Sequence, residues 1–469
     1  MFKGFIQKHI KGDKVLWMIM LLLSVASTLT VYSATGALAY KYQDGNTTYY
    51  VMKHVVIIMI GFVITFFIHK INYNKIRQYA KLMMFLTLPL LLLTLVLGVS
   101  LNSAARWITI PGIGLTFQTS DFAKFSLIIY VAYFIAKNQE NIGDFKKVFL
   151  PVIGVIAAVC ILILPANFST AALLFCVSMV MMFVGRIKMS HIGLLVGVCV
   201  IVLGIITSII FLAPDLLPRG ATWKHRIENF AGGGDEGDNF QADQSKIAIA
   251  TGGIFGKGPG NSIQRNFLPH PYSDFIYAII VEEYGMVGGV FILFLYLIIL
   301  FRAGMIVRKS EYRFPSLVAT GLAFSLAFQA MINMAVAVNL IPVTGQTLPL
   351  VSMGGSSVIF TSISFGLLLS VSRCLDPEEQ KVVDTSDENE EEPDSKISDE
   401  EAEDDDPDEK IKDEVEEPKS KKPVKAREIG EDFDDEEEVP ITKLQPRKQP
   451  KIAKEFDPDD IDIKTEERF

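Results

Sequence analysis

One carboxylate, Asp274, stands where a polar loop runs into a long apolar segment of the chain. A charged side chain at such a boundary is costly unless it is paired or takes part in function. An aspartate at the start of a helix also has an ordinary role, because it caps the helix and favours the positive end of the helix dipole. The sequence therefore leaves two roles open for Asp274, a working carboxylate and a helix cap.

The segment before Asp274 is rich in glycine and in polar side chains. Five glycines fall within residues 252–260, and glycine allows positive φ and close approach of the backbone to a ligand. A phosphate cradle is one interpretation, although no Walker lysine follows and no strand-to-helix context is expected. A turn-rich loop between helices is the alternative. The candidate ligand-binding side chains of this segment are Gln244, Ser245, Lys257, Asn261, Gln264 and Arg265.

Glu282 and Glu283 lie two turns beyond Asp274 in the apolar segment. Neighbouring side chains leave a helix in different directions, so these two carboxylates cannot point at the same partner. We expect one of them to face the interior of the helix bundle and to bind a cation or an arginine. A buried, hydrogen-bonded anchor is the alternative, and Glu283 is a candidate binding residue.

A further group of candidates surrounds the start of the apolar segment at residue 121. Arg106 and Trp107 are adjacent, and an indole packs on sugar or apolar faces while a guanidinium binds phosphate through paired hydrogen bonds. Anchoring at the membrane interface is the alternative for this pair. Lys124 is also a candidate ligand contact, but it shares a helix face with Asp121, so a local ion pair is equally expected.

Two turns carry the remaining candidates. Asn167 is either a helix cap or a ligand contact, and the composition of its turn favours the cap. The segment 341–357 contains two prolines and a Gly-Gly-Ser-Ser run, which interrupts helical hydrogen bonding at membrane depth and requires a cover of protein or a polar cavity. We expect such a cavity near Ser356 and Ser357, with helix packing through small residues as the alternative.

Apolar segments must position all of these side chains. Half of the 469 residues are hydrophobic, and the apolar segments approach the length of about 20 residues that crosses a bilayer. The sequence predicts an all-α integral membrane protein with about ten transmembrane helices and a large extracytoplasmic loop, about 214–273, between the seventh and eighth. The predicted helices are 15–36, 52–69, 80–100, 121–136, 147–165, 169–185, 190–213, 274–301, 314–340 and 352–373.

The distribution of lysine and arginine predicts the orientation of these helices across the membrane. Every second short loop is basic, which places both termini in the cytoplasm and the long loop outside. The basic residues of the long loop do not contradict this topology, since loops of about 60 residues largely escape the charge rule.

The composition changes abruptly after Cys374. Residues 375–469 carry a net charge of −22, whereas residues 1–374 carry +13. We predict a polytopic membrane domain over 1–374 and a disordered acidic cytoplasmic tail over 375–469. A purely solvating tail and a docking segment both remain open. The four cysteines lack zinc-site spacing and indicate packing residues, and no nucleic acid is expected as a partner.

The chain resembles the SEDS family of cell-wall polymerases over about residues 10–374. The motifs that carry the resemblance, in the family's order, are residues 105–108, 117–124, 244–245, 253–260, 267–269, 274–276, 282–285 and 348–357. Members of this family include FtsW of cell division and RodA of elongation. Residues 261–264 and the long charged tail look more like the FtsW branch, with the RodA branch as the second choice.

The resemblance implies a peptidoglycan glycosyltransferase that polymerises lipid II into glycan strands at the outer face of the cytoplasmic membrane, at the division site. Asp274 matches the family's catalytic aspartate and would act as general base in an inverting reaction. Arg106, Lys257 and Arg265 would neutralise the diphosphate. A divalent cation, Mg²⁺ or Mn²⁺, stays open, and its ligands are unknown. The implied partners are a class B penicillin-binding transpeptidase and membrane proteins of the division complex.

The chain also departs from the family pattern. Asn167 stands where an aspartate is usual, so a role that needs a carboxylate there is in doubt, and residues 119–121 and 270–273 also differ. A flippase for lipid-linked precursors and a non-catalytic scaffold are the rival functions. A flippase predicts ionisable residues through the whole bilayer, whereas here they gather in the expected outer half, around Asp121, Lys124, Asp274 and Glu283.

Overall fold

The computed structural model describes residues 11–97, 99–101, 104–109, 116–216, 220–230 and 240–375. Over these ranges, nine helices are long and apolar enough to cross a membrane, and the apolar helix α8 is slightly shorter. The prediction of about ten membrane helices is confirmed. They are α2 (Lys14–Ala34), α4 (Thr47–Ile68), α5 (Tyr73–Leu97), α6 (Thr119–Lys137), α7 (Leu150–Ile163), α8 (Phe168–Val184), α9 (Met189–Leu212), α12 (Ile276–Lys309), α13 (Arg313–Ala337) and α14 (Gly355–Arg373).

Local sequence signals fix where several helices begin. Asp13 caps α2 by accepting hydrogen bonds from the amides of residues 15 and 16, and Asn46 caps α4 through the amide of Tyr49. Asn167 does the same for α8 through the amide of Thr170. These are the short polar side chains that satisfy the free amides of a first helical turn. The fifth and sixth predicted helices are thus divided at Asn167.

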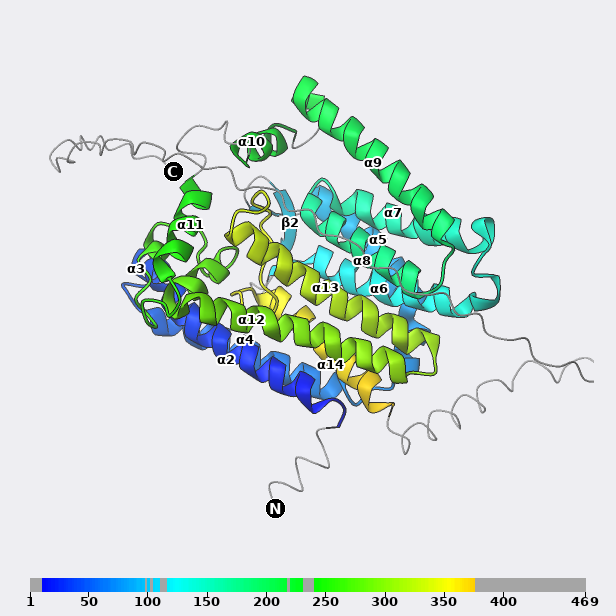
Figure 1. Ribbon diagram of the computed structural model, residues 1–469, viewed down its shortest axis with the longest axis horizontal. Helices are drawn as coiled ribbons and strands as arrows, with labels where there is room; N and C mark the ends of the chain where they lie inside the picture. The colour runs from blue at the N-terminus through cyan, green and yellow to red at the C-terminus, as the bar shows by residue number, and fades with distance from the viewer. Residues whose placement is uncertain are drawn as a thin grey trace, which may run out of the picture. The chain divides into compact units, whose positions relative to one another are not determined.

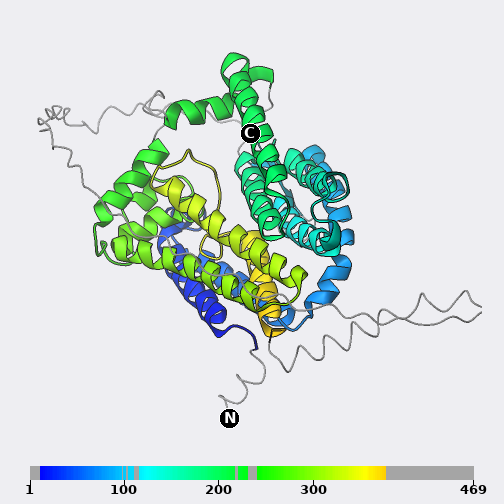
Figure 2. The ribbon, with the colours of Figure 1, turned by 45° about the vertical axis from the view of Figure 1, so that its right-hand side comes forward.

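Helix α13 is the centre of the bundle, and α9 lies at its edge. In the most apolar 18-residue stretch of each helix, 72% of the residues of α13 are buried, compared with 6% of those of α9. Figures 1 and 2 show α13 lying beside α12 and α6, while α9 leans away from the other helices. Since α9 is apolar along its whole length, a bilayer must cover most of it.

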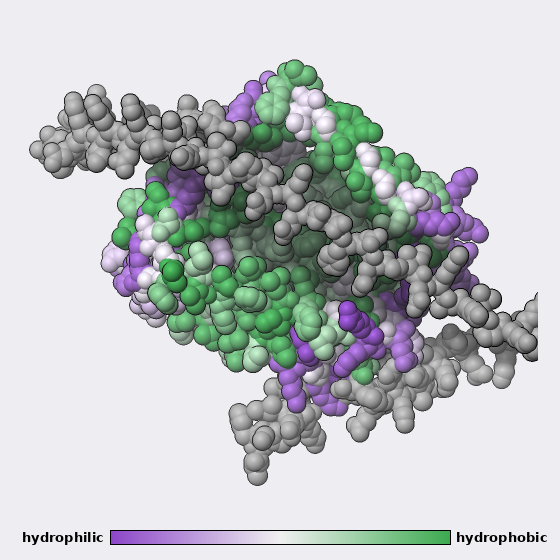
Figure 3. Space-filling model, viewed as in Figure 1, coloured by the Kyte–Doolittle hydropathy of each residue, from purple (hydrophilic) through white to green (hydrophobic). Residues whose placement is uncertain are grey.

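Small residues let two of the helices approach closely. A Cβ added at Gly61 of α4 would lie 2.4 Å from the hydroxyl of Ser362 on α14, and one at Gly366 of α14 would lie 2.9 Å from Cβ of Ile68. Small residues at such contacts are typical of membrane helix packing. Figure 3 shows hydrophobic residues over the face formed by α12 and α2, with hydrophilic residues gathered toward the helix ends.

A small antiparallel sheet precedes α6 and was not predicted. It consists of β1 (Val99–Leu101), β2 (Ala104–Thr109) and β3 (Thr116–Gln118), in the order β1-β2-β3. Trp107 pairs with Val99 on one side and Gln118 on the other. The predicted all-α membrane protein is confirmed, and this sheet is an addition in one loop, where strand pairing satisfies the backbone groups.

The long loop before α12 contains two helices of its own. These are α10 (Gly220–Phe230) and α11 (Phe240–Gly252), of which α11 packs against α12 and α13. The short helix α3 (Gly36–Tyr42) follows α2. Helix α12 begins two residues later than predicted and is interrupted at Gly285, whose φ of 71° and ψ of −173° are not helical.

Candidate active site

Asp274 lies in the turn that leads into α12, and its side chain is partly exposed. The hydroxyl of Ser273 donates to its Oδ1 over 2.9 Å. The N-cap residue of α12 is Phe275, and among the described residues no side-chain hydrogen bond caps this helix. The geometry therefore does not support the helix-cap alternative and leaves the carboxylate of Asp274 available for other chemistry.

The backbone around Asp274 is held by polar side chains of the bundle. Asn333 on α13 donates from Nδ2 to the carbonyl of Asp274 over 2.8 Å and to the carbonyl of Gln346 over 2.7 Å. Ser352 donates to the carbonyl of Ser273 over 2.7 Å. Because Asn333 and Ser352 are buried, the peptide groups on both sides of the Asp274 Cα are fixed from inside the protein.

A buried histidine, His54, is connected through Ser27 to the segment that contains Ser352. The hydroxyl of Ser27 on α2 donates to the carbonyl of Val351 over 2.7 Å and lies 2.7 Å from Nε2 of His54 on α4. Since the single hydroxyl proton points at Val351, His54 must donate its Nε2 proton to Ser27. Val351 directly precedes Ser352, so the pair Ser27–His54 is connected to the Asp274 turn.

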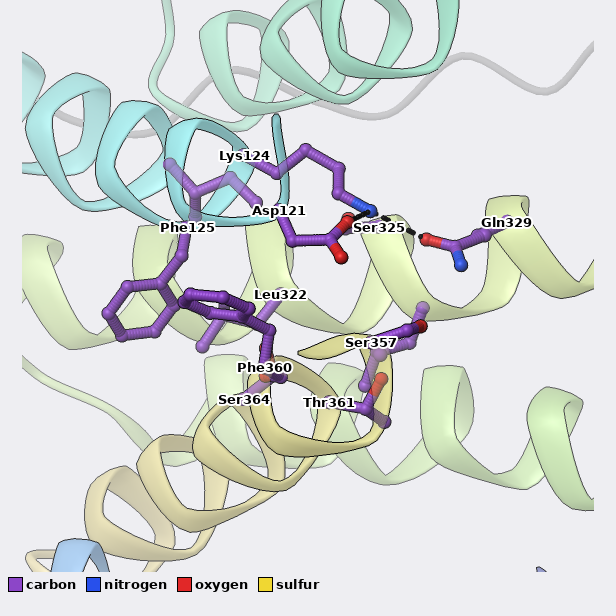
Figure 4. Close-up of a pocket in the computed structure, with 12 residues that line it drawn as sticks. Asp121, Lys124, Phe125, Leu322, Ser325, Gln329, Ser357, Phe360, Thr361 and Ser364 are labelled. Carbon is purple, nitrogen blue, oxygen red and sulfur yellow. Dashed lines mark hydrogen bonds and ion pairs between the residues drawn. The ribbon is translucent and has the colours of Figure 1, made fainter. Parts of the chain in front are cut away.

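A polar pocket opens between α6, α13 and α14 (Figure 4). Lys124 forms an ion pair with Oδ1 of Asp121 over 2.8 Å and donates to Oε1 of Gln329 over 3.0 Å. Ser357, Thr361 and Ser364 of α14 line the opposite wall. The local ion pair expected from the i,i+3 spacing is present, and so is the polar cavity expected beside the last helix.

The pocket and the Asp274 turn share one support, the segment 346–347. Gln329 donates from Nε2 to the carbonyl of Thr347 over 2.9 Å, and the hydroxyl of Thr347 lies 3.1 Å from that of Ser357. The neighbouring carbonyl, of Gln346, accepts from the same Asn333 side chain that holds Asp274. Hydrogen bonds to the neighbouring carbonyls of Gln346 and Thr347 therefore connect Lys124, through the backbone of this segment, with the backbone of Asp274.

Glu282 organises the chain that follows the glycine-rich loop. Its carboxylate is fully buried, pairs with Nζ of Lys257 over 2.7 Å, and accepts from the hydroxyl of Ser262 over 2.5 Å. The amides of Ile263 and Gln264 also donate to it. Lys257 therefore has a carboxylate partner within the protein and is not a free cation for a diphosphate in this arrangement.

Glu283 shares Ser262 with Glu282, since the Ser262 hydroxyl binds Glu282 and its amide binds Glu283. The expectation that the two carboxylates have no partner in common is therefore wrong, because a loop residue can reach both through its side chain and its backbone. The hydroxyl of Ser33 on α2 and the amide of Ser262 both donate to its Oε1. Arg265 donates from Nη1 to the Ser33 hydroxyl over 2.9 Å. The Oε2 atom of Glu283 is buried without a partner among the described residues. Both glutamates are thus buried anchors, and Arg265 is held beside one of them.

The glycine-rich loop lies directly on the backbone of α12. A Cβ at Gly256 would lie 2.2 Å from the carbonyl oxygen of Glu283, and one at Gly252 would lie 2.1 Å from that of Val281. The amides of Lys257 and Gly258 donate to the carbonyls of Glu282 and Glu283. The glycines therefore allow close approach to a helix rather than to a phosphate, which favours the loop interpretation over the cradle.

The remaining candidates fall in different environments. Ser245 is fully buried and donates to the carbonyl of Ala337 over 2.7 Å, which holds α11 against α13. Asn261 is exposed, Gln244 is partly exposed, and Ser356 is buried with its hydroxyl unpaired among the described residues. Asn167 serves as the cap that its turn favoured. The backbone of Arg106 and Trp107 lies in β2, and their side chains lie outside the described residues.

Several site residues were missed in the sequence. Gln329 and Asn333 lie one turn apart in an otherwise apolar helix, and polar groups in such a helix commonly mark a functional interior. That signal was present in the sequence. His54 and Ser27 gave a weaker signal, because one histidine and one serine in separate apolar segments do not reveal that they meet.

Within the residues that the structure describes, no three His, Cys, Asp or Glu side chains form a metal-binding group. Mg²⁺ is commonly held by one or two carboxylates together with substrate phosphates and waters. Asp274 fits that mode, since it presents a partly exposed carboxylate.

Comparison with known proteins decides the family. The family model described as "Cell cycle protein", which represents FtsW, RodA and SpoVE, matches residues 13–376. The chain belongs to this family. Stage V sporulation protein E of Bacillus subtilis is 35% identical over 78% of this chain and 98% of that protein. Haemophilus influenzae has a protein named "Probable peptidoglycan glycosyltransferase FtsW" that is 34% identical over 76% of this chain and 90% of its own length.

Solved structures share the fold of this FtsW/RodA/SpoVE member. A chain of a peptidoglycan synthase complex that coordinates polymerization and crosslinking is 26% identical, with a TM-score of 0.62 over 78% of this chain and 99% of that one. The rod shape determining protein RodA of Thermus thermophilus is 24% identical, with a TM-score of 0.56 over 78% of this chain and 98% of that one. The chain is a multi-pass membrane protein of this fold.

Proposed function

We propose that this chain is a peptidoglycan glycosyltransferase that polymerises lipid II into glycan strands at the outer face of the cytoplasmic membrane. The observation that carries the proposal is the Asp274 turn. A partly exposed carboxylate, which caps no helix, is held through the backbone by Asn333 and Ser352. The names of its relatives and its family membership support the same activity.

In the proposed reaction, Asp274 acts as general base. The carboxylate accepts the proton of the acceptor sugar hydroxyl as that oxygen attacks the anomeric carbon of the donor. The new glycosidic C–O bond forms with inversion, while the bond from the anomeric carbon to the diphosphate breaks. Undecaprenyl diphosphate leaves with the bonding electron pair, and its negative charge must be stabilised.

Lys124 is a candidate to stabilise that charge. Like Lys257, it is paired with a carboxylate, but it lines an open pocket whose Gln329 also binds the segment that supports the Asp274 turn. The Asp121 carboxylate beside Lys124 would orient the ammonium group toward the pocket. Arg106 stays a candidate from the sequence for the same task.

An apolar cleft near the site suits the polyprenyl part of the substrate. It lies between the start of α8, the end of α9, α10 and residues 342–344, and contains about 830 Å³ of empty space, including the part open to solvent. Leu203, Ile206 and Ile210 of α9 form one wall. A polyprenyl chain could occupy such a cleft in place of lipid acyl chains.

We assign the chain to septal synthesis on the FtsW-like residues 261–264 and the long charged tail, with RodA-like elongation as the alternative. A class B penicillin-binding transpeptidase is the proposed partner, because a structural relative belongs to a complex that both polymerises and crosslinks. Division-complex membrane proteins would activate the pair.

The proposal also requires a particular orientation, with both termini in the cytoplasm. Asp235→Cys should react with a membrane-impermeant thiol reagent added outside the cell, and Lys309→Cys should be protected. The opposite pattern would place Asp274 on the cytoplasmic side and contradict synthesis at the outer face.

The function is tested by strand synthesis from lipid II in proteoliposomes. The purified chain, with its cognate transpeptidase present but inhibited by a β-lactam, should convert fluorescent lipid II into long glycan strands that lysozyme digests. Transport of lipid II across the bilayer without strand formation would instead favour the flippase. Neither activity would favour the non-catalytic scaffold.

A further inference from the structure

The tip of the glycine-rich loop presents two large apolar side chains away from the protein. Ile254 is 63% exposed and Phe255 is 84% exposed. They lie in a polar segment that the sequence assigns to a loop outside the membrane, where exposed apolar side chains of this size need an explanation.

The loop is fastened to α12 at the point where that helix begins to face lipid. The amides of Met286 and Val287 donate to the carbonyls of Gly253 and Ile254. Met286 and Val287 are both more than half exposed. On the N-terminal side of Gly285, toward Asp274, every residue of the helix from Ile276 to Glu283 is buried instead. The exposed tip of the loop therefore continues the exposed face of α12.

The length of that face shows why a continuation is needed. The exposed apolar residues of α12 are Met286, Val287, Val290, Phe291, Phe294, Leu297 and Phe301. From Met286 to Phe301 a helix rises about 22 Å, whereas the hydrocarbon core of a bilayer is about 30 Å thick. About 8 Å of lipid-facing surface must come from another part of the chain, and any tilt of α12 increases this deficit.

The loop also covers the backbone of the two buried glutamates, and its Lys257 pairs with the carboxylate of Glu282. Glu282 and Glu283 are 0% and 1% exposed, and the backbone of residues 256–258 lies across their carbonyls. Carboxylates facing acyl chains would be costly. A non-helical backbone is tolerated at membrane depth when protein satisfies its polar groups, and the hydrogen bonds between residues 253–258 and α12 do so.

We propose that the tip Ile254–Phe255 is immersed in the acyl-chain region of the bilayer, where it completes the lipid-facing surface of α12. Residues 252–260 are then a membrane-inserted wedge rather than an aqueous loop. The Asp274 turn, beyond the buried part of α12, is thereby fixed close to the membrane surface, where the reducing end of a lipid-linked sugar lies. The proposal about the wedge does not depend on the proposed function.

Depth-dependent quenching tests the wedge. The four native cysteines are replaced by alanine, Phe255→Cys is labelled with bimane, and the full chain is placed in nanodiscs without any transpeptidase. Phe294→Cys on the exposed face of α12 serves as the lipid control. Lys246→Cys on α11, where an exposed ion pair with Asp243 indicates water, serves as the aqueous control.

The label at position 255 should be quenched by brominated lipid and resist aqueous iodide, following position 294. Quenching by iodide in the manner of position 246 would overturn the proposal. Resistance to both quenchers would overturn it as well, because the tip would then be covered by protein rather than by lipid.

Discussion

At the scale of single residues, the position of Asp274 depends on contacts to its backbone more than on contacts to its carboxylate. Asn333 and Ser352 hold the two carbonyls around its Cα, and Ser273 is the hydrogen-bond donor to its side chain. A general base needs both a fixed place and a free lone pair. The backbone contacts fix the position of Asp274, and the few contacts to its carboxylate leave lone pairs free.

The pair Ser27–His54 gives a prediction at this scale. Ser27→Ala removes the donor to Val351 and leaves the buried Nε2 proton of His54 without an acceptor, which typically costs about 1–3 kcal/mol. We expect a lower thermal transition and a lower kcat for strand synthesis. Both are measured on the purified variant in proteoliposomes.

Ser24→Ala is the matched control for that variant. Ser24 lies one turn earlier on α2, is equally buried, and donates only to the carbonyl of Met20 within its own helix. Ser24→Ala should change neither the thermal transition nor kcat for strand synthesis appreciably. Equal effects of the two variants would show that the contact with Val351 does not matter to the Asp274 turn.

Sequence reasoning found the chemically distinctive residues more readily than their partners. Asp274, Lys124 and Asn167 were identified from residue type and local spacing, and two of these have the neighbours that spacing predicted. The support from Asn333, Ser352 and His54 depends on contacts between segments distant along the chain. Such contacts leave no periodic signal in one sequence.

At the scale of elements, hydrophobic patterning predicted the membrane helices but not the loops between them. The sheet β1–β3 was missed because it is short and lies among turn-forming residues, where strand pairing is set by the hairpin rather than by a long alternating pattern. The helices α10 and α11 were missed because they are polar and short. They are far less hydrophobic than a membrane helix, so a search for apolar segments of bilayer-crossing length passes over them.

The glycine-rich loop gives a prediction at this scale. Gly256 has a φ of 81° and Gly260 a φ of 80°, but only a Cβ at Gly256 would meet a neighbour, the Glu283 carbonyl at 2.2 Å. Gly260→Ala should cost only the backbone strain, about 1 kcal/mol. Gly256→Ala should cost this strain and also displace the loop from α12.

Thermal unfolding of the two variants in the same detergent measures the difference. Gly256→Ala should show the lower transition temperature and the weaker strand synthesis. Similar transition temperatures for both would mean that the close packing of this loop on α12 does not stabilise the protein.

At the scale of the whole molecule, the membrane domain and the acidic tail differ in charge and in family membership. The family match ends at residue 376, one residue beyond Leu375, which still packs against the hydrophobic core. The boundary at 374/375 stays a prediction from the change in composition. The role of residues 376–469 remains a prediction from composition.

Truncation tests that prediction. A chain that ends after Leu375 should insert into the membrane and keep its intrinsic polymerase activity, because the removed segment is rich in charge and poor in apolar side chains. Membrane accumulation and strand synthesis are measured against the full chain. Failure of the truncated chain to accumulate would reveal a structural role for the tail.

The central claim is that the whole bundle presents Asp274 as the general base of a glycosyltransferase. The most direct test is the rate of strand synthesis from lipid II by purified Asp274→Asn, since asparagine keeps the size of the side chain and accepts hydrogen bonds but cannot accept the proton at neutral pH. The variant should insert, keep the wild-type thermal transition and bind its transpeptidase, while synthesis falls by at least about 100-fold. Near-normal synthesis by a folded Asp274→Asn protein would contradict the assignment.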